Sequence, residues 1–381
     1  MTALSGFGTH SRISSSSGGL WRRVDISLVL VTLAVSGYGL LMVFSATRGN
    51  GSVANRSFLD RQMTFAFIGV VLMAAAMLFD YRRLRELVAI AYIGTIVVLL
   101  AVPVLGVEVN GARAWFRLGP LALQPSEFGK VVVVVALATY FSSDRGAPGM
   151  RQVLVGLLVV GLPSALIMLQ PDLGTVLVYF ALTAAILVVA GVRPRHLLLL
   201  ALVVVLGTAL TLRVGLLDAY QVDRLTAFVD NKPTKANEAV FLHQERAQTA
   251  IGNGGLFGQG LFEGSQKRSS LVPEKQTDFI FTVVGEELGF VGGAVLIALY
   301  GFMILRIWRI GATAPDLFGT LLCGGVLAML MFQIFESVGM TSGIMPITGI
   351  PLPFVSYGGS SILASFLGIG LVESVHMRRF A

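Results

Sequence analysis

The chain has 381 residues, of which 55% are hydrophobic and only 13% carry a charge, and its mean hydropathy is +0.80. A soluble domain of this size needs more polar side chains to cover its surface, so this composition excludes a soluble globular protein. The net charge of +7 comes mostly from arginines between apolar stretches, and it gives no argument for nucleic-acid binding.

Apolar stretches long enough to cross a bilayer recur along the whole chain. A spanning helix needs about 20 such residues. The sequence therefore predicts an all-α, polytopic integral membrane protein with about ten transmembrane helices. They are expected near residues 25–46, 62–79, 87–105, 122–142, 153–170, 173–191, 196–214, 280–305, 316–340 and 361–377.

Arginines are distributed unevenly between the two sets of loops. Loops on the cytoplasmic side of a membrane carry an excess of Lys and Arg, so the richer set is assigned to that side. Both termini are then cytoplasmic, and a large loop at about 215–279, between helices 7 and 8, is extracytoplasmic. The richer set contains Arg12, Arg22, Arg23, Arg82, Arg83, Arg85, Arg145, Arg151, Arg193, Arg195, Arg306, Arg309, Arg378 and Arg379.

The chain is expected to form one transmembrane domain over residues 22–381. Residues 1–21 are rich in Ser and Gly and predict a disordered cytoplasmic tail. The single cysteine, Cys323, lies within a predicted helix and allows no disulfide within the chain. The four histidines are scattered, so the sequence predicts no metal-binding cluster.

Three polar segments interrupt the apolar pattern, at residues 110–130, 272–290 and 348–361. Non-helical backbone at membrane depth is tolerated only where protein buries it or where it lines a wet cavity. The three segments are therefore expected to converge on one cavity. Within the second of them, Asp278 lies where a polar loop enters an apolar helix, and such a carboxylate at the bilayer rim is a candidate catalytic group.

A glycine cluster at residues 252–260 invites comparison with a phosphate-binding loop. However, no strand precedes it and no Lys-Ser/Thr pair closes it. We favour the interpretation that its glycines allow the backbone to turn sharply beside the active face.

Four motifs, in this order and spacing, resemble the SEDS family of bacterial shape, elongation, division and sporulation proteins. The resemblance covers about residues 22–379, and the last loop is closer to the elongation branch than to the division branch. The motifs read QPSEFGK, AIGNGGLFGQG, TDFIFTVVGEELG and TGIPLPFVSYGGSS.

The resemblance implies a peptidoglycan glycosyltransferase that polymerises lipid II in the bacterial cytoplasmic membrane. It also implies a class B penicillin-binding protein and other elongation-complex proteins as partners. The catalytic aspartate of the family's TDF motif falls on Asp278. The chemistry agrees, because inverting attack on a sugar with a diphosphate leaving group needs one general base rather than a carboxylate pair.

The departing diphosphate needs positive charge from Lys, from Arg or from a divalent cation such as Mg or Mn bridging the pyrophosphate. We expect Lys130 and Arg113 to contact it, with Glu127 beside Lys130 and Trp115 packing against lipid or sugar. Further substrate-binding residues are expected in the polar segments and in the large loop. They are Gln124, Arg224, Ser356 and Ser360.

Each assignment has a structural alternative. Asp278 would equally suit the N-cap of the following helix. Glu127 and Lys130 would form a buried ion pair, and Trp115 would anchor at the membrane interface. Four further acidic residues are given structural roles: Asp172 marks a helix turn, Glu286 and Glu287 pair with Arg or Lys of a neighbouring helix, and Glu336 needs a partner that the sequence does not name.

Two other functions remain open at this stage. A lipid II flippase would also contain about ten helices with intramembrane charges, although no inverted repeat is visible. A non-catalytic scaffold for the penicillin-binding protein would use the same helices without any reaction. Substitution of Asp278 separates these functions, because it should abolish catalysis and leave a scaffold intact.

Overall fold

The computed structural model describes residues 23–48, 56–109, 112–118, 121–143, 146–203, 238–264 and 275–379. The predicted N-terminal tail and Arg224 lie outside these ranges, as do the parts of the predicted 215–279 loop at 215–237 and 265–274.

Helices dominate the described chain, which confirms the predicted all-α membrane class. Within the described residues, seven helices are long and apolar enough to cross a membrane, and Leu173–Val189 and Pro194–Val203 are shorter apolar helices. The number of ten transmembrane helices stays a prediction. The helices are α1 Ile26–Thr47, α2 Arg56–Leu78, the short 3-10 helix η3 Tyr81–Arg83, α3 Leu84–Leu105, α4 Pro125–Ser142, α5 Met150–Met168, α6 Leu173–Val189, α9 Glu238–Asn253, α11 Ile280–Ala312, α12 Leu317–Ser342 and α13 Gly359–Met377.

Aspartate caps set several of these helix starts. Asp25 accepts hydrogen bonds from the backbone N–H groups of Ser27 and Leu28 at the start of α1. Asp172 and Asp316 accept in the same way at the starts of α6 and α12. An N-cap carboxylate satisfies N–H groups that lack a partner in the first turn and interacts favourably with the helix dipole. The role of Asp172 at the α5–α6 turn was predicted and is confirmed.

A small antiparallel sheet lies between α3 and α4, where only irregular backbone was expected. It contains β1 Val107–Val109, β2 Ala112–Leu118 and β3 Leu121–Leu123, in the order β1-β2-β3. Val107 pairs with Trp115, and Phe116 pairs with Leu123. The aromatic and β-branched residues in this segment favour strands, but the stronger apolar pattern of the flanking helices obscures that signal.

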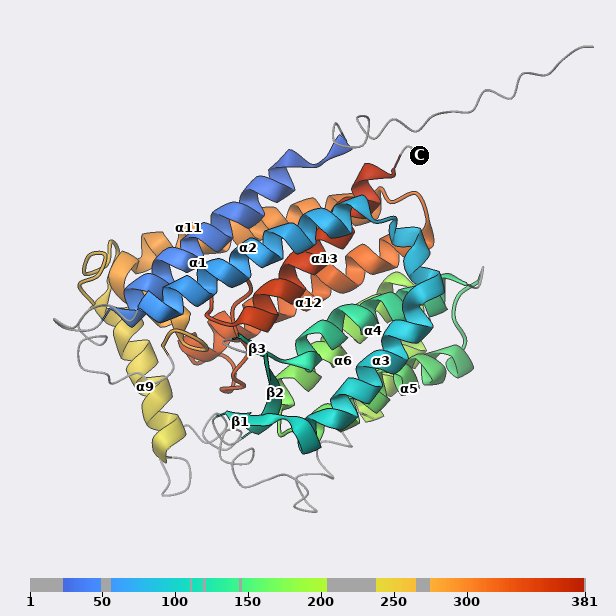
Figure 1. Cartoon of the computed structure of the whole chain (residues 1–381), viewed down its shortest axis with the longest axis horizontal. Helices are drawn as coiled ribbons and strands as arrows, with labels where there is room; N and C mark the ends of the chain where they lie inside the picture. The colour runs from blue at the N-terminus through green and yellow to red at the C-terminus, as the bar shows by residue number, and fades with distance from the viewer. Residues whose placement is uncertain are drawn as a thin grey trace, which may run out of the picture.

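Helix α13 occupies the centre of the bundle and packs along α2 (Figure 1). The two helices approach closely because Gly370 has no side chain: a Cβ there would lie 2.6 Å from the carbonyl oxygen of Met73. Small residues commonly allow such close contact between membrane helices. Most of α13 is therefore buried, and one continuous apolar cluster connects it with α1, α4, α6, α11 and α12.

Helix α11 contains a break at Gly289, whose φ of 64° and ψ of −161° are not helical. The glycine cluster, in the segment 254–260, supplies the hydrogen bonds that the break removes. The N–H groups of Gln259 and Gly260 donate to the carbonyls of Glu286 and Glu287, at 2.9 and 3.1 Å. In return, two N–H groups after the break, those of Phe290 and Val291, donate to carbonyls of the same segment. Gly255, Gly258 and Gly260 have positive φ angles, so the backbone turns sharply at these glycines, as predicted.

Candidate active site

Asp278 lies on the short segment that leads into α11, and it is partly exposed. The helix begins at Ile280 and its N-cap position is Phe279, whose carbonyl accepts a hydrogen bond from the Thr282 N–H at 3.0 Å. Asp278 therefore lies one residue before the cap position. The capping alternative for Asp278 stays a prediction.

The loop between α12 and α13 holds the segment that carries Asp278. The Ser356 hydroxyl donates to the carbonyl of Thr277 at 2.6 Å, and the Tyr357 N–H donates to the carbonyl of Gln276 at 2.8 Å. The loop is itself fixed, because the buried Gln62 side chain donates to the Ser356 carbonyl at 3.0 Å. Ser356, predicted as a substrate-binding residue, thus contacts the backbone beside Asp278.

Gly349 brings the same loop directly against the Asp278 carboxylate. A Cβ at position 349 would lie 3.2 Å from Asp278 Oδ2, and the φ of Gly349 is +77°. A side chain there would be strained by the backbone conformation and would also crowd the carboxylate. The carboxylate is therefore packed over bare backbone, which keeps one side of it close to the loop.

A second polar cluster joins the starts of α4, α6 and α13. The Gln124 N–H donates to Ser360 Oγ at 2.7 Å, and the Gln124 side-chain amide donates to Asp172 Oδ2 at 2.9 Å. Asp172 also accepts from the N–H and the hydroxyl of Thr175, at 2.9 and 2.7 Å. Gln124 and Ser360, which the sequence predicted separately, are brought together here.

Lys130 and Glu127 form an ion pair at 2.7 Å, one turn inside α4, and both side chains are buried. The buried ion pair that was the structural alternative for these two residues is therefore confirmed. Burial raises the pKa of the nearby Asp172, and the charge of Glu127 adds to the rise, while hydrogen bonds from Thr175 and the charge of Lys130 oppose it. These three groups thus share one electrostatic environment. Within the described residues, Glu127 Oε2, Ser126 Oγ and Ser361 Oγ are buried without a hydrogen-bond partner.

Thr348 connects the two clusters. Its carbonyl oxygen would lie only 2.8 Å from a Cβ at Gly174, in the first turn of α6 beside Asp172. Its hydroxyl donates to Glu336 Oε1 of α12 at 2.9 Å. Since Gly349 follows Thr348 and lies beside the Asp278 carboxylate, one loop runs from the start of α6 to the candidate base. The partner of Glu336, which the sequence did not reveal, is Thr348.

The two predicted cationic residues have different partners in the structure. Arg113 is exposed on β2 and pairs with Glu108 at 3.6 Å, and Trp115 is half-buried opposite Val107. None of the contacts described for Arg113 connects it with Lys130. Arg117, further along β2, pairs with Ala122 of β3, the strand that leads into α4.

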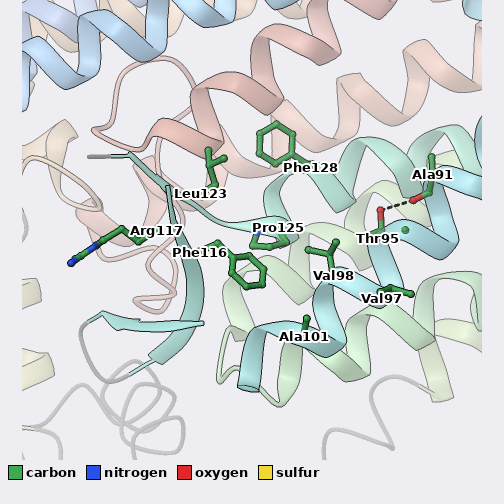
Figure 2. A pocket seen from close by; sticks show the side chains of 11 residues that line it. Ala91, Thr95, Val97, Val98, Ala101, Phe116, Arg117, Leu123, Pro125 and Phe128 are labelled. Atoms are coloured by element: carbon green, nitrogen blue, oxygen red, sulfur yellow. Dashed lines mark hydrogen bonds between the residues drawn. The ribbon is translucent and has the colours of Figure 1, made fainter. Parts of the chain in front are cut away.

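Arg117 lies at the edge of an apolar groove between α3, the sheet and α4, with a volume of about 640 Å³ (Figure 2). Its guanidinium points away from the apolar floor of the groove (Figure 2). The one hydroxyl among the lining residues, that of Thr95, donates to the carbonyl of Ala91 at 2.9 Å. The groove is thus shaped for an apolar chain. Its lining residues are Ala91, Gly94, Thr95, Val97, Val98, Ala101, Phe116, Arg117, Leu123, Pro125 and Phe128.

Glu287 lies beside the break in α11 and is fully buried. Its carboxylate accepts hydrogen bonds from the Ser45 hydroxyl and from the Phe262 N–H at 3.1 Å. Glu286 is also buried, and its carboxylate would lie 2.8 Å from a Cβ at Gly264. Glu287 therefore joins α1 and α11 to the segment that follows the glycine cluster, which is a structural role. The predicted pairing of Glu286 and Glu287 with Arg or Lys stays a prediction, because these partners of Glu287 are a hydroxyl and a backbone N–H.

The sequence missed the roles of Gln62, Thr175, Thr348 and Gly349. Gln62 and Thr175 are polar residues without a recognisable spacing to any motif. Thr348 and Gly349 open the predicted loop at 348–361, so a signal was present, but their contacts depend on how the loop folds back onto α12 and α6.

The comparisons with known proteins identify the family. The family model for FtsW, RodA and SpoVE, described as "Cell cycle protein", matches residues 26–380. The chain belongs to the FtsW/RodA/SpoVE family. This is the SEDS family that the four motifs resemble, and the predicted membership is confirmed.

Similar members of the FtsW/RodA/SpoVE family match over nearly their whole length. Peptidoglycan glycosyltransferase RodA of Treponema pallidum is 31% identical over 93% of this chain and 98% of its own length. Stage V sporulation protein E of Bacillus subtilis is 35% identical, with coverages of 92% and 96%. A solved structure, described as "Structural coordination of polymerization and crosslinking by a peptidoglycan synthase complex", superposes with a TM-score of 0.78 at 33% identity, over 94% of this chain and 98% of that one.

Proposed function

We propose that this protein is a peptidoglycan glycosyltransferase that polymerises lipid II, with Asp278 as the general base. The observation that carries the proposal is the partly exposed Asp278 carboxylate, fixed over Gly349 by a loop that also reaches the polar cluster at α4 and α6. In the reaction, Asp278 takes the proton from the acceptor hydroxyl. The hydroxyl oxygen attacks the anomeric carbon, and the bond from that carbon to the lipid diphosphate breaks with inversion.

The starts of α4, α6 and α13 form the site that we assign to the departing diphosphate. Gln124 joins all three starts, and Lys130 lies one turn inside α4. Helix N-termini carry partial positive charge and favour bound phosphate groups. The unpartnered hydroxyls of Ser126 and Ser361 are further donors of the kind that a diphosphate needs.

A divalent cation such as Mg²⁺ or Mn²⁺ remains part of the proposal. Oxygen donors suit these ions, and Glu127 Oε2 is a buried carboxylate oxygen without a hydrogen-bond partner in the described chain. Glu127 and Asp172 would hold the ion together with the diphosphate of the substrate. Its chemistry would be to neutralise charge on the leaving group.

The apolar groove between α3 and α4 supports the proposal that the substrate is lipid-linked. We assign it to part of the substrate's hydrocarbon chain, because its lining is almost wholly apolar and α4 leads from it to Lys130. Trp115 and Arg113 remain proposed contacts on the sheet, and Arg117 is added to them. An elongation role, with a class B penicillin-binding protein and other elongation-complex proteins as partners, is also part of the proposal. The relative named RodA and the solved peptidoglycan synthase complex support it.

Polymerisation of purified lipid II by the protein with its partner tests the function. We expect Asp278→Asn to reduce the rate by about 10² or more, the usual contribution of a general base, with a melting temperature near wild type. Asn keeps the size of the side chain over Gly349 and cannot accept the proton. A variant that polymerises at close to the wild-type rate would show that Asp278 is not the base.

The same assay separates the other two functions. A flippase moves lipid II across vesicles without forming glycan, and a scaffold supports the partner without either activity. The break in α11 is a feature of many transporters, which is the observation that favours a flippase. Wild-type protein that transports lipid II but forms no glycan would replace the enzyme proposal with this one.

We further propose that the protein lies in the bacterial cytoplasmic membrane with both termini in the cytoplasm. Single cysteines at Gly146 and Gly252, in a Cys323→Ala background, test the orientation. A Cβ at either glycine would meet no other group within 4 Å, so the substitutions are sterically neutral. Only position 252 should react with an impermeant thiol reagent added outside. Labelling of position 146 from outside would reverse the orientation.

A further inference from the structure

We propose that Glu336 is a positioning residue for the general base, acting through Thr348. The inference rests on the proposed function of Asp278 and adds a residue that lies on another helix. Glu336 is on α12, its side chain is completely buried, and Oε1 accepts the hydroxyl of Thr348 at 2.9 Å. Within the described residues Oε2 has no hydrogen-bond partner.

A buried carboxylate inside a membrane-spanning helix is costly and needs a reason to persist. The surrounding contacts do not supply a structural one, because Glu336 has no ion-pair partner among the described residues. An apolar side chain of similar volume would often stabilise such a position. The one described hydrogen bond that Glu336 makes fixes Thr348, so its effect must pass through that residue.

Thr348 is held on two sides. Its hydroxyl is tied to Glu336, and its carbonyl is packed against Gly174 at the start of α6. The next residue, Gly349, is in the left-handed region, and a Cβ placed on it would lie 3.2 Å from Asp278 Oδ2, so its backbone lies beside the carboxylate. Because the position of Gly349 follows from that of Thr348, the Glu336–Thr348 bond sets how closely the loop approaches the base.

This geometry defines the expected kinetic effect. If the bond is lost, Thr348 and Gly349 can shift together, and Asp278 loses its alignment with the acceptor hydroxyl. Small displacements of this kind reduce the chemical step and leave substrate binding largely unchanged. The effect should therefore fall on kcat, and it should disappear when the base itself is absent.

The test uses Thr348→Val, which removes the hydroxyl and keeps the shape of the side chain. We expect kcat for lipid II polymerisation to fall about tenfold, with KM within about twofold of wild type. Thr348→Ser keeps the hydroxyl and should restore most of the rate. Glu336→Gln keeps an acceptor for Thr348 and should retain more activity than Glu336→Met, which removes it.

The matched control is Thr183→Val, on α6. Thr183 is buried whereas Thr348 is half-buried, and the Thr183 hydroxyl donates to the carbonyl of Tyr179 at 2.6 Å. A similar loss of melting temperature in Thr183→Val and Thr348→Val, with a loss of kcat only in the latter, supports the positioning role.

A double variant shows whether the effect passes through the base. Adding Thr348→Val to Asp278→Asn should not lower the residual rate further. A wild-type kcat in Thr348→Val would overturn the inference. So would a double variant in which Thr348→Val lowers the residual rate of Asp278→Asn by the same factor as it lowers the wild-type rate. If Thr348→Val does not fold, Glu336→Met compared with Glu336→Gln gives the same decision. Wild-type protein that forms no glycan would instead reject the proposed function.

Discussion

The two ends of the helical bundle are held together by different kinds of contact. At one end, which we call the arginine end, charged side chains join the helix termini. Asp25 pairs with Arg306 and Asp316 with Arg82 and Arg85. At the other end, the site end, backbone groups and neutral side chains make most of the described contacts around Asp278.

We infer from this difference that the charges of the arginine end stabilise the fold, whereas those of the site end serve the reaction. The ion pairs of the arginine end close contacts between distant helices, such as Arg378 of the C-terminal segment with Asp80 before η3. At the site end, the side chains of Glu127 and Glu336 are buried, and each has one carboxylate oxygen without a hydrogen-bond partner in the described chain. Asp172 shares the electrostatic environment of Glu127 and Lys130. Substitutions at the arginine end should thus change stability alone, whereas substitutions at the site end should change activity, with a loss of stability as well where they leave a buried charge unpaired.

The largest effect is expected from Lys130→Met. The variant leaves Glu127 buried without its charge partner, so the free energy of unfolding should fall by about 3–5 kcal/mol. Polymerisation should also fall by at least about tenfold if Lys130 contacts the diphosphate. Chemical denaturation and the lipid II assay measure the two effects separately.

The control for Lys130→Met is Glu127→Gln combined with Lys130→Met. Removing both charges should recover most of the stability while the protein stays inactive. A double variant with a near wild-type rate would show that Lys130 has only a structural role, and the comparison between the two ends would then fail at this pair.

A smaller effect is expected from Gly258→Ala, in the glycine cluster that hydrogen-bonds to the backbone on both sides of the break in α11. A Cβ there would lie 2.1 Å from the carbonyl oxygen of Glu287, at a φ of +81°. We expect a loss of about 1–3 kcal/mol in unfolding free energy, the usual scale for a forced overlap. Gly252→Ala is the matched control, since its Cβ would meet nothing within 4 Å, and equal stability of the two variants would contradict the packing argument.

The smallest effect is expected from Asp316→Asn at the arginine end. Burial alone would raise the pKa of Asp316, but hydrogen bonds from Gly319 and Tyr81 and the charges of Arg85 and Arg82 lower it below its usual value. Asn keeps the helix cap and loses the charge, so we expect a loss of about 0.2–1 kcal/mol at neutral pH. The rate of polymerisation should not change.

The sign of the Asp316 effect with pH follows from its lowered pKa. Its charge stabilises the fold above the unfolded-state pKa of about 3.9, and this contribution is lost as the pH falls through the lower pKa of the folded state. The difference in melting temperature between wild type and Asp316→Asn should therefore shrink below about pH 4. A difference that stays constant down to pH 3 would show that the charge is not its source.

The membrane class, most helix positions and the candidate base could all be predicted from the order of residues. Hydropathy identifies these features because a spanning helix must be apolar along about 20 residues, and because Asp278 interrupts that pattern. The family motifs also marked Lys130, Glu127, Gln124, Ser356 and Ser360, all of which lie in the two joined clusters. The small sheet was missed because a few short strands leave little signal between strong apolar stretches.

Which polar groups meet one another depends on how the helices and loops pack. Thr348 finds Glu336 because the loop after α12 folds back onto its own helix, and Gln124 joins Asp172 to Ser360 across three helices. The hydrogen bonds across the α11 break join backbone N–H and carbonyl groups, which nearly every residue carries. The side chains in the sequence therefore could not predict these bonds. Hydropathy is a property of each segment, whereas these contacts arise only where packing brings distant segments together.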